Sequence, residues 1–270
     1  KLKSSAIKKL AVKYELKVLQ PKELDDPSFI KELKEINPKL GVIVAFRMLP
    51  EQVWSLPELG SINLHASLLP MYRGAAPINW AIMNGEEKTG VTTFFLKHKL
   101  DTGDILDKKE VAIENTDTAG VLHEKLKKVG ASLLSKSVKD VLNGNYVADP
   151  QEKIESDKLK KAPKIHTETC KINWRASSKR IYDHIRGLNP YPGAWTILRN
   201  VNEGKELRVK IFDVEYEISN VYGKTEGEIY VEGSSFKICA SDGYIIVREI
   251  QPPDKKKMDV NSFLNGYSIT

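Results

Sequence analysis

The order of apolar patterns along the chain is the feature that most restricts its fold. Up to about Leu142, patterns typical of amphipathic helices alternate with short apolar runs typical of strands. The clearest strand pattern is the apolar run 41–46, and the longest helical pattern begins at Asp117 or Thr118 and ends near Leu142. This alternation predicts an α/β fold with a doubly wound, mostly parallel sheet. In such a fold, ligands bind beyond the carboxyl ends of the strands.

The remaining patterns of this part predict the individual elements. Ser5 is suited to cap a first helix, and Pro27 and Ser28 precede a second one. We expect helices over 5–14, 28–36, 50–54 and 77–83, and strands over 17–19, 41–46, 61–65, 91–96 and 105–113.

The composition changes near Ala148, which predicts a domain boundary. Residues 149–167 are polar and rich in lysine, as expected of a linker between a first domain, 1–148, and a second, 168–270. After one helical pattern over 178–188, several strand patterns follow in succession, which predicts a small β-barrel or sandwich. These patterns cover 195–198, 207–214, 227–231, 236–240 and 244–250, and we expect Trp174, Tyr191 and Trp195 to belong to the core of this domain.

Composition narrows the class of protein further. The chain has 42 Lys and Arg against 36 Asp and Glu, a net charge of +6, which permits a polyanionic partner without requiring one. Cys170 and Cys239 form neither a metal-binding spacing nor a disulfide framework, so we expect no metal and a reducing cytoplasm. There is no apolar run long enough to cross a membrane and no phosphate-binding glycine motif. The polar start without an initiator Met suggests part of a longer protein.

The most informative polar residues lie between Ser61 and Asp104. Asn63 and His65 are two apart in a predicted strand, so their side chains lie on one face. An amide and an imidazole there can stabilise a carbonyl oxygen as it becomes negatively charged, and Asp101 on a later loop can pair with His65. The alternative is a buried structural histidine, with Asp101 forming an Asx-turn with Gly103. Both interpretations remain open on spacing alone.

A loop rich in apolar residues follows this strand. It covers 67–77, with Pro70 and Gly74 to bend it and Arg73 near its end. Such a loop can line an apolar ligand site or can simply connect two elements.

Three segments resemble the folate-dependent formyltransferases. They are Asn-Leu-His-Ala-Ser-Leu-Leu-Pro at 63–70, Tyr-Arg-Gly-Ala-Ala-Pro-Ile at 72–78 and Leu-Asp-Thr-Gly-Asp at 100–104. Segments 171–174, 186–192 and 251–257 are similar to the C-terminal domain of that family. The resemblance implies a Rossmann-like formyltransferase domain followed by an OB-like barrel that binds tRNA. It also implies that a strand, a helix and a second strand precede the region matching Lys1.

The resemblance implies a reaction and a set of site residues. A formyl group would pass from 10-formyltetrahydrofolate to the amino group of methionine carried by initiator tRNA, with Asn63, His65 and Asp101 as catalytic residues. No covalent intermediate is needed, and a monomer is expected. The residues expected to bind folate are Phe46, Arg47, Met48, Leu49, Ser67, Leu68, Leu69, Pro70 and Lys97.

The tRNA contacts are predicted from charge. Lys160, Lys161, Lys164 and Lys171 can form a strip that binds phosphates, or they can be solvated surface residues. The acceptor also stays open, because formyltransferases that act on a phosphoribosyl-glycinamide or a nucleotide-sugar amine share features of this pattern. A non-catalytic tRNA-binding module with a residual folate site is the alternative from a different class.

Overall fold

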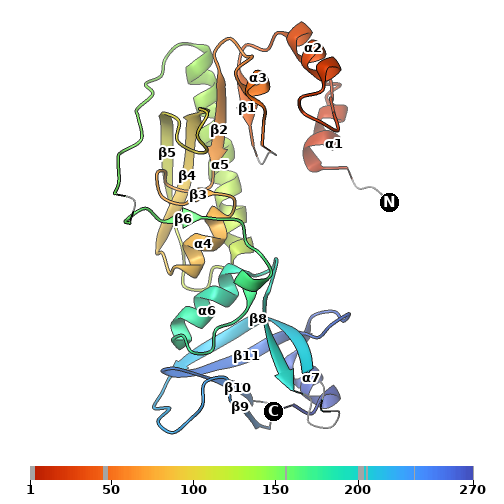
Figure 1. Ribbon diagram of the computed structural model, residues 1–270, viewed down its shortest axis with the longest axis vertical. Helices are drawn as coiled ribbons and strands as arrows, with labels where there is room; N and C mark the ends of the chain where they lie inside the picture. The colour runs from red at the N-terminus through yellow and green to blue at the C-terminus, as the bar shows by residue number, and fades with distance from the viewer. Residues whose placement is uncertain are drawn as a thin grey trace.

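The computed structural model describes residues 4–44, 48–155, 157–199, 204, 206–233 and 235–269. These residues form two bodies placed end to end, with the N-terminal body at the top of Figure 1. The upper body contains a four-stranded sheet in the order β1-β2-β4-β5. Its strands are β1 (Gly41–Ile43), β2 (Ser61–His65), β4 (Lys88–Phe95) and β5 (Ile105–Ala112).

This sheet is mixed, and the prediction of a mostly parallel sheet is wrong for the described strands. β1 and β2 are parallel, whereas β2 pairs antiparallel with β4, and β4 pairs antiparallel with β5. The connection 96–104 is shorter than the dozen or more residues that a parallel crossover needs, so β5 has to return beside β4 in the opposite direction. The alternation of patterns is therefore a correct guide to the α/β class but not to strand direction.

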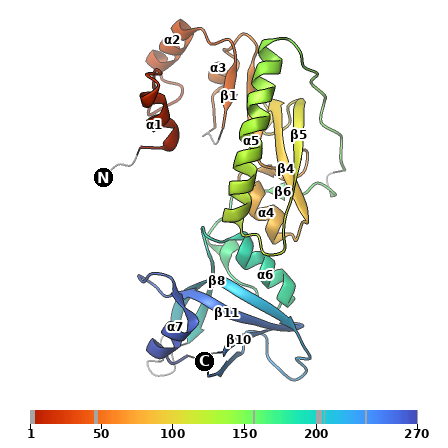
Figure 2. The ribbon, with the colours of Figure 1, turned by 180° about the vertical axis from the view of Figure 1, so that it is seen from behind.

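One long helix covers a face of this sheet. Helix α5 (Ala119–Leu142) has 24 residues, or about 36 Å, and runs lengthwise along the strands in Figure 2. Thr118 caps it, as predicted, by accepting a hydrogen bond from the Val121 amide at 3.2 Å. Its buried face includes Leu122, Leu126 and Leu133. Together with α4 (Pro77–Met83) it closes the core of the upper body.

The N-terminal elements are less well covered. Helices α1 (Ala6–Lys13), α2 (Pro27–Ile36) and α3 (Glu51–Trp54) confirm the predicted positions, and Ser5 caps α1. The strand predicted at 17–19 does not form, because this segment has no neighbouring strand among the described residues with which to pair. β1 is not covered on both faces as predicted, since Val42 is 44% exposed.

The segment joining the two bodies packs against the upper one. Asp149 forms a bridge with Ile105, and β6 (Lys161–Ala162) pairs in parallel with β3 (Arg73–Gly74). Figure 1 shows this segment crossing in front of the sheet near α4. The chain between the bodies is therefore attached to the loop that follows His65.

The lower body is an antiparallel sheet with a helix at each end of its sequence. The strands run in the order β7-β8-β11-β10-β9, with β12 paired to β11, and no ladder among the described strands closes them into a barrel. Trp195 is buried and Trp174 packs on the same core, but Tyr191 is 81% exposed, so its predicted core position is wrong. It lies between Pro190 and Pro192 in a surface turn.

The bounds of the elements in the lower body are as follows: η1 (Glu168–Cys170), α6 (Ser178–Gly187), β7 (Ala194–Arg199), β8 (Glu206–Ile218), β9 (Ile229–Glu232), β10 (Ser235–Ala240), β11 (Gly243–Gln251), β12 (Met258–Asp259) and α7 (Val260–Gly266).

Helix α6 joins the two bodies. A side chain at Gly187 would come within 2.6 Å of Met83 Cγ, so the two helices α4 and α6 meet closely at this glycine. The buried Arg186 guanidinium donates to Asp183 of its own helix at 2.7 Å and to the Asp117 carbonyl of the upper body at 2.8 Å. The interface is therefore held by both apolar and charged contacts. In the part of the chain that the structure describes, no helix is long and apolar enough to span a membrane.

Candidate active site

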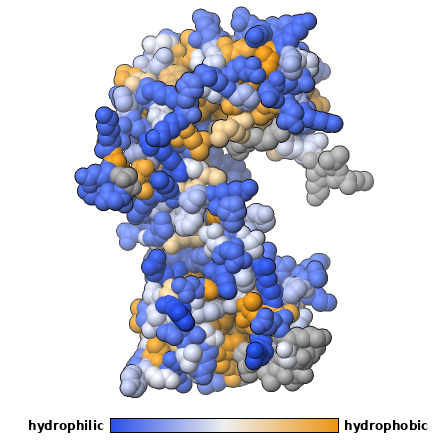
Figure 3. Space-filling view, in the orientation of Figure 1, coloured by the Kyte–Doolittle hydropathy of each residue, from blue (hydrophilic) through white to orange (hydrophobic). Residues whose placement is uncertain are grey.

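A cavity of about 780 Å³ lies in the upper body at the end of β2. Asn63, His65 and Asp101, the three residues predicted to be catalytic, all line it. The rest of its wall is mostly apolar and includes Ile78, Leu100 and Leu126. In the space-filling view, the molecule is deeply indented between its two bodies, which leaves room for a large substrate (Figure 3).

His65 is buried and held from one side. Its Nε2 lies 2.8 Å from the Tyr72 carbonyl oxygen, and because that oxygen can only accept, Nε2 carries a hydrogen in this contact. The other ring nitrogen, Nδ1, lies 3.9 Å from Asp101 Oδ2. This separation is longer than a hydrogen bond, so Nδ1 faces a carboxylate without being bonded to it.

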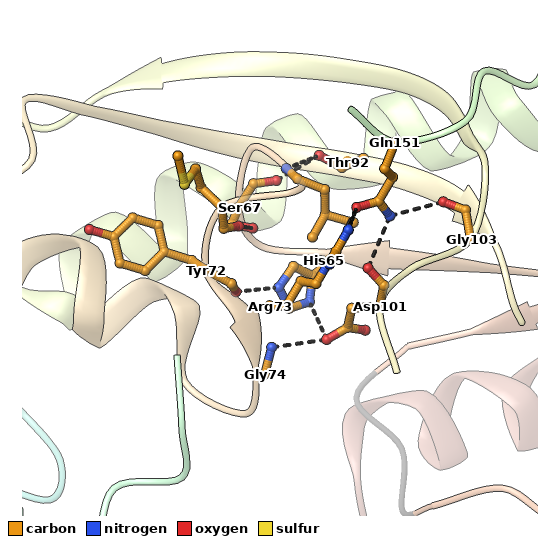
Figure 4. A network of polar contacts seen from close by, with 11 residues as sticks. His65, Ser67, Tyr72, Arg73, Gly74, Thr92, Asp101, Gly103 and Gln151 are labelled. Atoms are coloured by element: carbon orange, nitrogen blue, oxygen red, sulfur yellow. Dashed lines mark hydrogen bonds and ion pairs between the residues drawn. The ribbon is translucent and has the colours of Figure 1, made fainter. Parts of the chain in front are cut away.

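Asp101 is fixed by the loop that follows His65. Its Oδ2 accepts a hydrogen bond from the Gly74 amide at 3.0 Å, and its backbone has a left-handed φ of +52°. The Asx-turn with Gly103, offered as the alternative, is not formed among the described contacts; the carboxylate points to Gly74 and His65 instead (Figure 4). The residues therefore come together as the catalytic interpretation requires.

Arg73 and Gln151 complete this network. Arg73 belongs to the loop predicted to line a ligand site, whereas no sequence pattern indicates Gln151. Gln151 donates through Nε2 to the carbonyls of Asp101 and Gly103, at 2.9 Å each, and its Oε1 accepts from Arg73 at 3.2 and 2.5 Å. Burial lowers the pKa of Arg73, while the charge of Asp101 raises it. Neither the lysine-rich composition around Gln151 nor its spacing from Asp101 predicts this contact.

Tyr72 supports the same loop from the other side. Its phenol donates to Glu86 at 2.5 Å and accepts from Asn84 at 3.1 Å. Burial, and then the hydrogen bond to Glu86, raise the pKa of Tyr72 well above its usual value. Its backbone carbonyl is thus presented to His65 by an anchored, un-ionised side chain.

Asn63 lies on the same strand face as His65. It is buried, and its side chain makes no hydrogen bond to the described residues. Its amide atoms are not among the buried atoms that lack a partner, so they are open to the cavity, where water or a ligand can satisfy them. Its position at the cavity wall leaves it free to donate to a bound molecule.

The residues predicted to bind folate are only partly brought to this cavity. Met48 lines it, whereas Phe46 and Arg47 lie outside the described residues. Ser67, Leu69 and Pro70 are buried beneath the loop, where the Ser67 carbonyl and Leu69 amide bond Thr92. Leu49 and Leu68 are partly exposed and Lys97 is exposed, but none of the three lines the cavity. Lys97 pairs with Asp104 at 2.7 Å. Contacts between these residues and folate stay a prediction.

The lysines predicted to bind tRNA lie beside the site and at the junction of the two bodies. Lys160, Lys161 and Lys164 are exposed, and Lys160 pairs with Glu86. Lys171 is exposed too, and it lines a second cavity of about 430 Å³ between α4 and α6, together with Arg175 and Arg180. In that cavity, the buried Nε2 of His184 has no hydrogen-bond partner among the described residues.

Comparison with known protein families decides the class of the chain. A family model described as formyl transferase matches residues 2–138, and one described as formyl transferase, C-terminal domain, matches residues 164–268. The chain belongs to the formyltransferase family. The two matched ranges correspond to the upper and lower bodies of this formyltransferase, and the segment that carries Gln151 and Lys161 falls between them.

Curated relatives carry a more specific name. A methionyl-tRNA formyltransferase of Bacteroides fragilis is 44% identical over all of this chain and 83% of its own length. One from Azobacteroides pseudotrichonymphae is 47% identical over 97% of this chain and 82% of its own. Both similarities extend across the two bodies of this formyltransferase.

Solved structures share the fold at lower identity. HypX from Aquifex aeolicus in complex with tetrahydrofolic acid has a TM-score of 0.64 at 20% identity, covering 88% of this chain and 40% of its own. WlaRD, a sugar 3N-formyl transferase, has a TM-score of 0.65 at 23% identity, covering 93% of this chain and 82% of its own. At these identities the likeness concerns the fold alone.

Proposed function

We propose that this chain transfers the formyl group of 10-formyltetrahydrofolate to the amino group of methionyl initiator tRNA, in support of translation initiation. The curated relatives named methionyl-tRNA formyltransferase, at 44 and 47% identity, support this acceptor. The observation that carries the proposal is the meeting of Asn63, His65 and Asp101 in one cavity of a formyltransferase.

The roles of the site residues follow from the negative charge that develops on the formyl oxygen during transfer. A neutral amine attacks the formyl carbon, and negative charge builds on the formyl oxygen. The Asn63 amide and protonated His65 stabilise that oxygen, since neither the amide nor Nδ1 is committed to another protein group among the described residues. Asp101 accepts, directly or through water, the proton that the amine loses. The bond between the formyl carbon and N10 of the folate then breaks, and N10 takes up a proton as tetrahydrofolate leaves. No nucleophile of the protein enters this scheme.

The cavity suits the cosubstrate. Its apolar wall can cover a flat pterin ring, and its volume is in the range of small-molecule sites. The ring would lie against Met48 and the neighbouring loop residues predicted above, with the formyl carbon toward Asn63 and His65. No metal is part of this proposal.

We assign the remaining organisation on the same basis. Residues 1–148 form the catalytic domain, 149–167 the linker, and 168–270 an OB-like tRNA-binding domain, for which the antiparallel order β7-β8-β11-β10-β9 is the support. The exposed cations Lys161, Lys164 and Lys171, with Lys160, form the tRNA strip. We propose that the protein acts as a monomer in the cytoplasm.

A transfer assay tests the function. The protein is incubated with 10-formyltetrahydrofolate labelled in the formyl group and with methionyl initiator tRNA. Free methionine and uncharged tRNA serve as controls, and label is expected on the methionine amine of the charged tRNA alone. Label on a small amine, or folate binding without transfer, would contradict the proposal.

A further inference from the structure

The catalytic site draws on a residue from the segment that joins the two bodies. Gln151 lies fifty residues after Asp101 in the sequence, yet its side chain reaches the main chain of the Asp101 loop (Figure 4). The orientation of its amide is unambiguous. Arginine can only donate and a carbonyl can only accept, so Oε1 faces Arg73 and Nε2 faces the carbonyls of Asp101 and Gly103.

The Asp101 loop needs such support. Asp101 has a left-handed φ, which is strained at a residue other than glycine and persists where its surroundings enforce it. Two carbonyls, one on each side of Thr102, converge on the same Gln151 amide. The loop is also pressed against β4, because a side chain at Gly103 would overlap the Phe95 carbonyl. The Asp101 loop therefore packs against β4 at Gly103 and is held by Gln151 through its carbonyls.

Gln151 also separates two charges. It accepts both hydrogen bonds from the Arg73 guanidinium, whose charge interacts with the Asp101 carboxylate without a direct contact. A direct Arg73–Asp101 ion pair would draw the carboxylate away from His65. The neutral amide keeps Arg73 near while Oδ2 stays between the Gly74 amide and His65 Nδ1.

We propose that Gln151 is a positioning residue, which holds Asp101 facing His65 by donating to the main chain of its loop. This inference rests on the proposed function for the role of Asp101, and it makes the segment between the two bodies a part of the active site. The bonds donated by Nε2 hold the loop, and the bonds accepted from Arg73 orient the amide and keep the guanidinium from pairing with Asp101.

Two variants separate these contributions. Gln151→Ala removes all the bonds, whereas Gln151→Glu keeps an acceptor for Arg73 but cannot donate to the carbonyls. In steady-state transfer to methionyl-tRNA, we expect kcat to fall by about 10- to 100-fold in both variants, the size expected for a misplaced catalytic group. KM for either substrate should stay within about twofold, since Gln151 does not line the cavity. Glu152→Ala, an exposed neighbour, serves as the control and should behave as the unaltered protein.

Amide hydrogen exchange supplies a readout that does not depend on the acceptor. The Gly74 amide is held by Asp101 Oδ2, so its exchange should accelerate by about tenfold or more in both Gln151 variants and not in Glu152→Ala. Unchanged kcat in Gln151→Ala, recovery in Gln151→Glu, or unchanged Gly74 exchange would overturn the inference. If the unaltered protein fails to formylate methionyl-tRNA, the proposed function fails, but the exchange result still decides the positioning role.

Discussion

Asn63 lies two residues before His65 on β2, with its amide at the cavity wall and no partner among the described residues. We expect Asn63→Ala to lower kcat/KM by about two to three decades, equivalent to about 3–4 kcal/mol, because one donor to the developing oxyanion is lost. Thermal stability should hardly change, since no hydrogen bond between described residues is broken. Steady-state kinetics and a melting curve on the purified variant measure both.

The isosteric variant Asn63→Asp serves as the control for this role. Its carboxylate has the shape of the amide but accepts instead of donating. We expect a loss at least as large as that of the alanine variant. Activity close to that of the unaltered protein in Asn63→Asp would show that donation from residue 63 is not required.

His184 makes a prediction about stability and pH. Burial lowers its pKa below the ordinary 6.5, so the unfolded chain binds this proton more readily than the folded one. The free energy of unfolding should therefore decrease as the pH falls below about 6.5. His184→Asn, which keeps a donor near the position of Nδ1, should flatten this dependence. Urea unfolding at pH 7.5 and pH 5.5 compares the two proteins; an equal slope in both would exclude His184 as its source.

Among the elements, the short pair of β3 and β6 matters for the site, because it includes Gly74, whose amide holds Asp101. Gly74 has φ +126°, and a side chain there would come within 2.4 Å of the Ala162 carbonyl oxygen. We expect Gly74→Ala to separate β3 from β6, to displace the amide that holds Asp101, and to lower kcat by more than tenfold. It should also cost about 2 kcal/mol or more of stability, from both backbone strain and the clash.

Gly144 provides a matched comparison. It also has a positive φ, +71°, but no atom lies within 4 Å of the position that a side chain would occupy. Gly144→Ala should cost only the backbone term, about 1–2 kcal/mol, and leave kcat unchanged. Equal kinetic effects of the two substitutions would show that the β3–β6 contact has no role in the site.

The elements also show how far the sequence can be interpreted. Helices α2, α4, α5 and α6 lie where the caps and apolar spacing predict them, because those signals are local. The antiparallel pairing of β4 with β2 and β5 could not be predicted in this way. It depends on which strands lie side by side, and the periodicity of apolar residues does not indicate that. The pair β3–β6 has two residues on each side and no pattern of its own, so it could not be predicted.

The same distinction holds for the site. Asn63, His65 and Asp101 could be predicted because the family resemblance includes them, and strand spacing places Asn63 and His65 on one face. The meeting of Gln151 with Arg73 could not, since it depends on where a lysine-rich segment returns in three dimensions. Ser67 and Leu69 belong to the same family-like segment, 63–70, as Asn63 and His65. They are buried beneath the loop and do not line the cavity, so nearness in sequence does not predict their position.

At the scale of the whole molecule, the buried Arg186, which is paired with Asp183 of its own helix, connects the two bodies through its bond to the Asp117 carbonyl. Arg186→Met leaves Asp183 in a buried site with Lys179 as its remaining cation, at 2.6 Å. Breaking a buried pair costs about 3–5 kcal/mol, and we expect the lower end here because Lys179 remains. The missing bond to the Asp117 carbonyl also weakens the interface, so calorimetry should show two transitions in place of one.

The control for this substitution is Lys125→Met. Lys125 also bonds Asp117, through Oδ2 at 2.6 Å, but its side chain is partly exposed and this ion pair lies within the upper body. Its removal leaves the buried Asp117 carboxylate bonded, among the described residues, to the Glu114 amide alone, so we expect a cost of about 1–3 kcal/mol and a single transition. A single transition in Arg186→Met would mean that other contacts between α4 and α6 suffice to couple the bodies.

The cationic strip predicts how tRNA affinity depends on salt. The double variant Lys161→Ala, Lys164→Ala should weaken binding of methionyl-tRNA, and the slope of log K against log salt should decrease by about 0.7–0.9 for each phosphate that the protein no longer neutralises. Binding titrations at several salt concentrations measure it. Arg248→Ala is the control, because that guanidinium is already paired with Glu215, at 3.0 and 3.1 Å. An unchanged slope in the double variant would remove these lysines from the interface.

The path of residues 149–155 and 157–163 along the upper body also determines where the protein can be divided. A fragment that ends with α5 at Leu142 would contain every residue that lines the main cavity, yet it would lack Gln151 and the partner of β3. Such a fragment is expected to fold around α5 and still be a poor catalyst. Chimaeras that exchange the second domain should therefore be joined after Pro163, whose carbonyl is already bonded by Trp80 of the first.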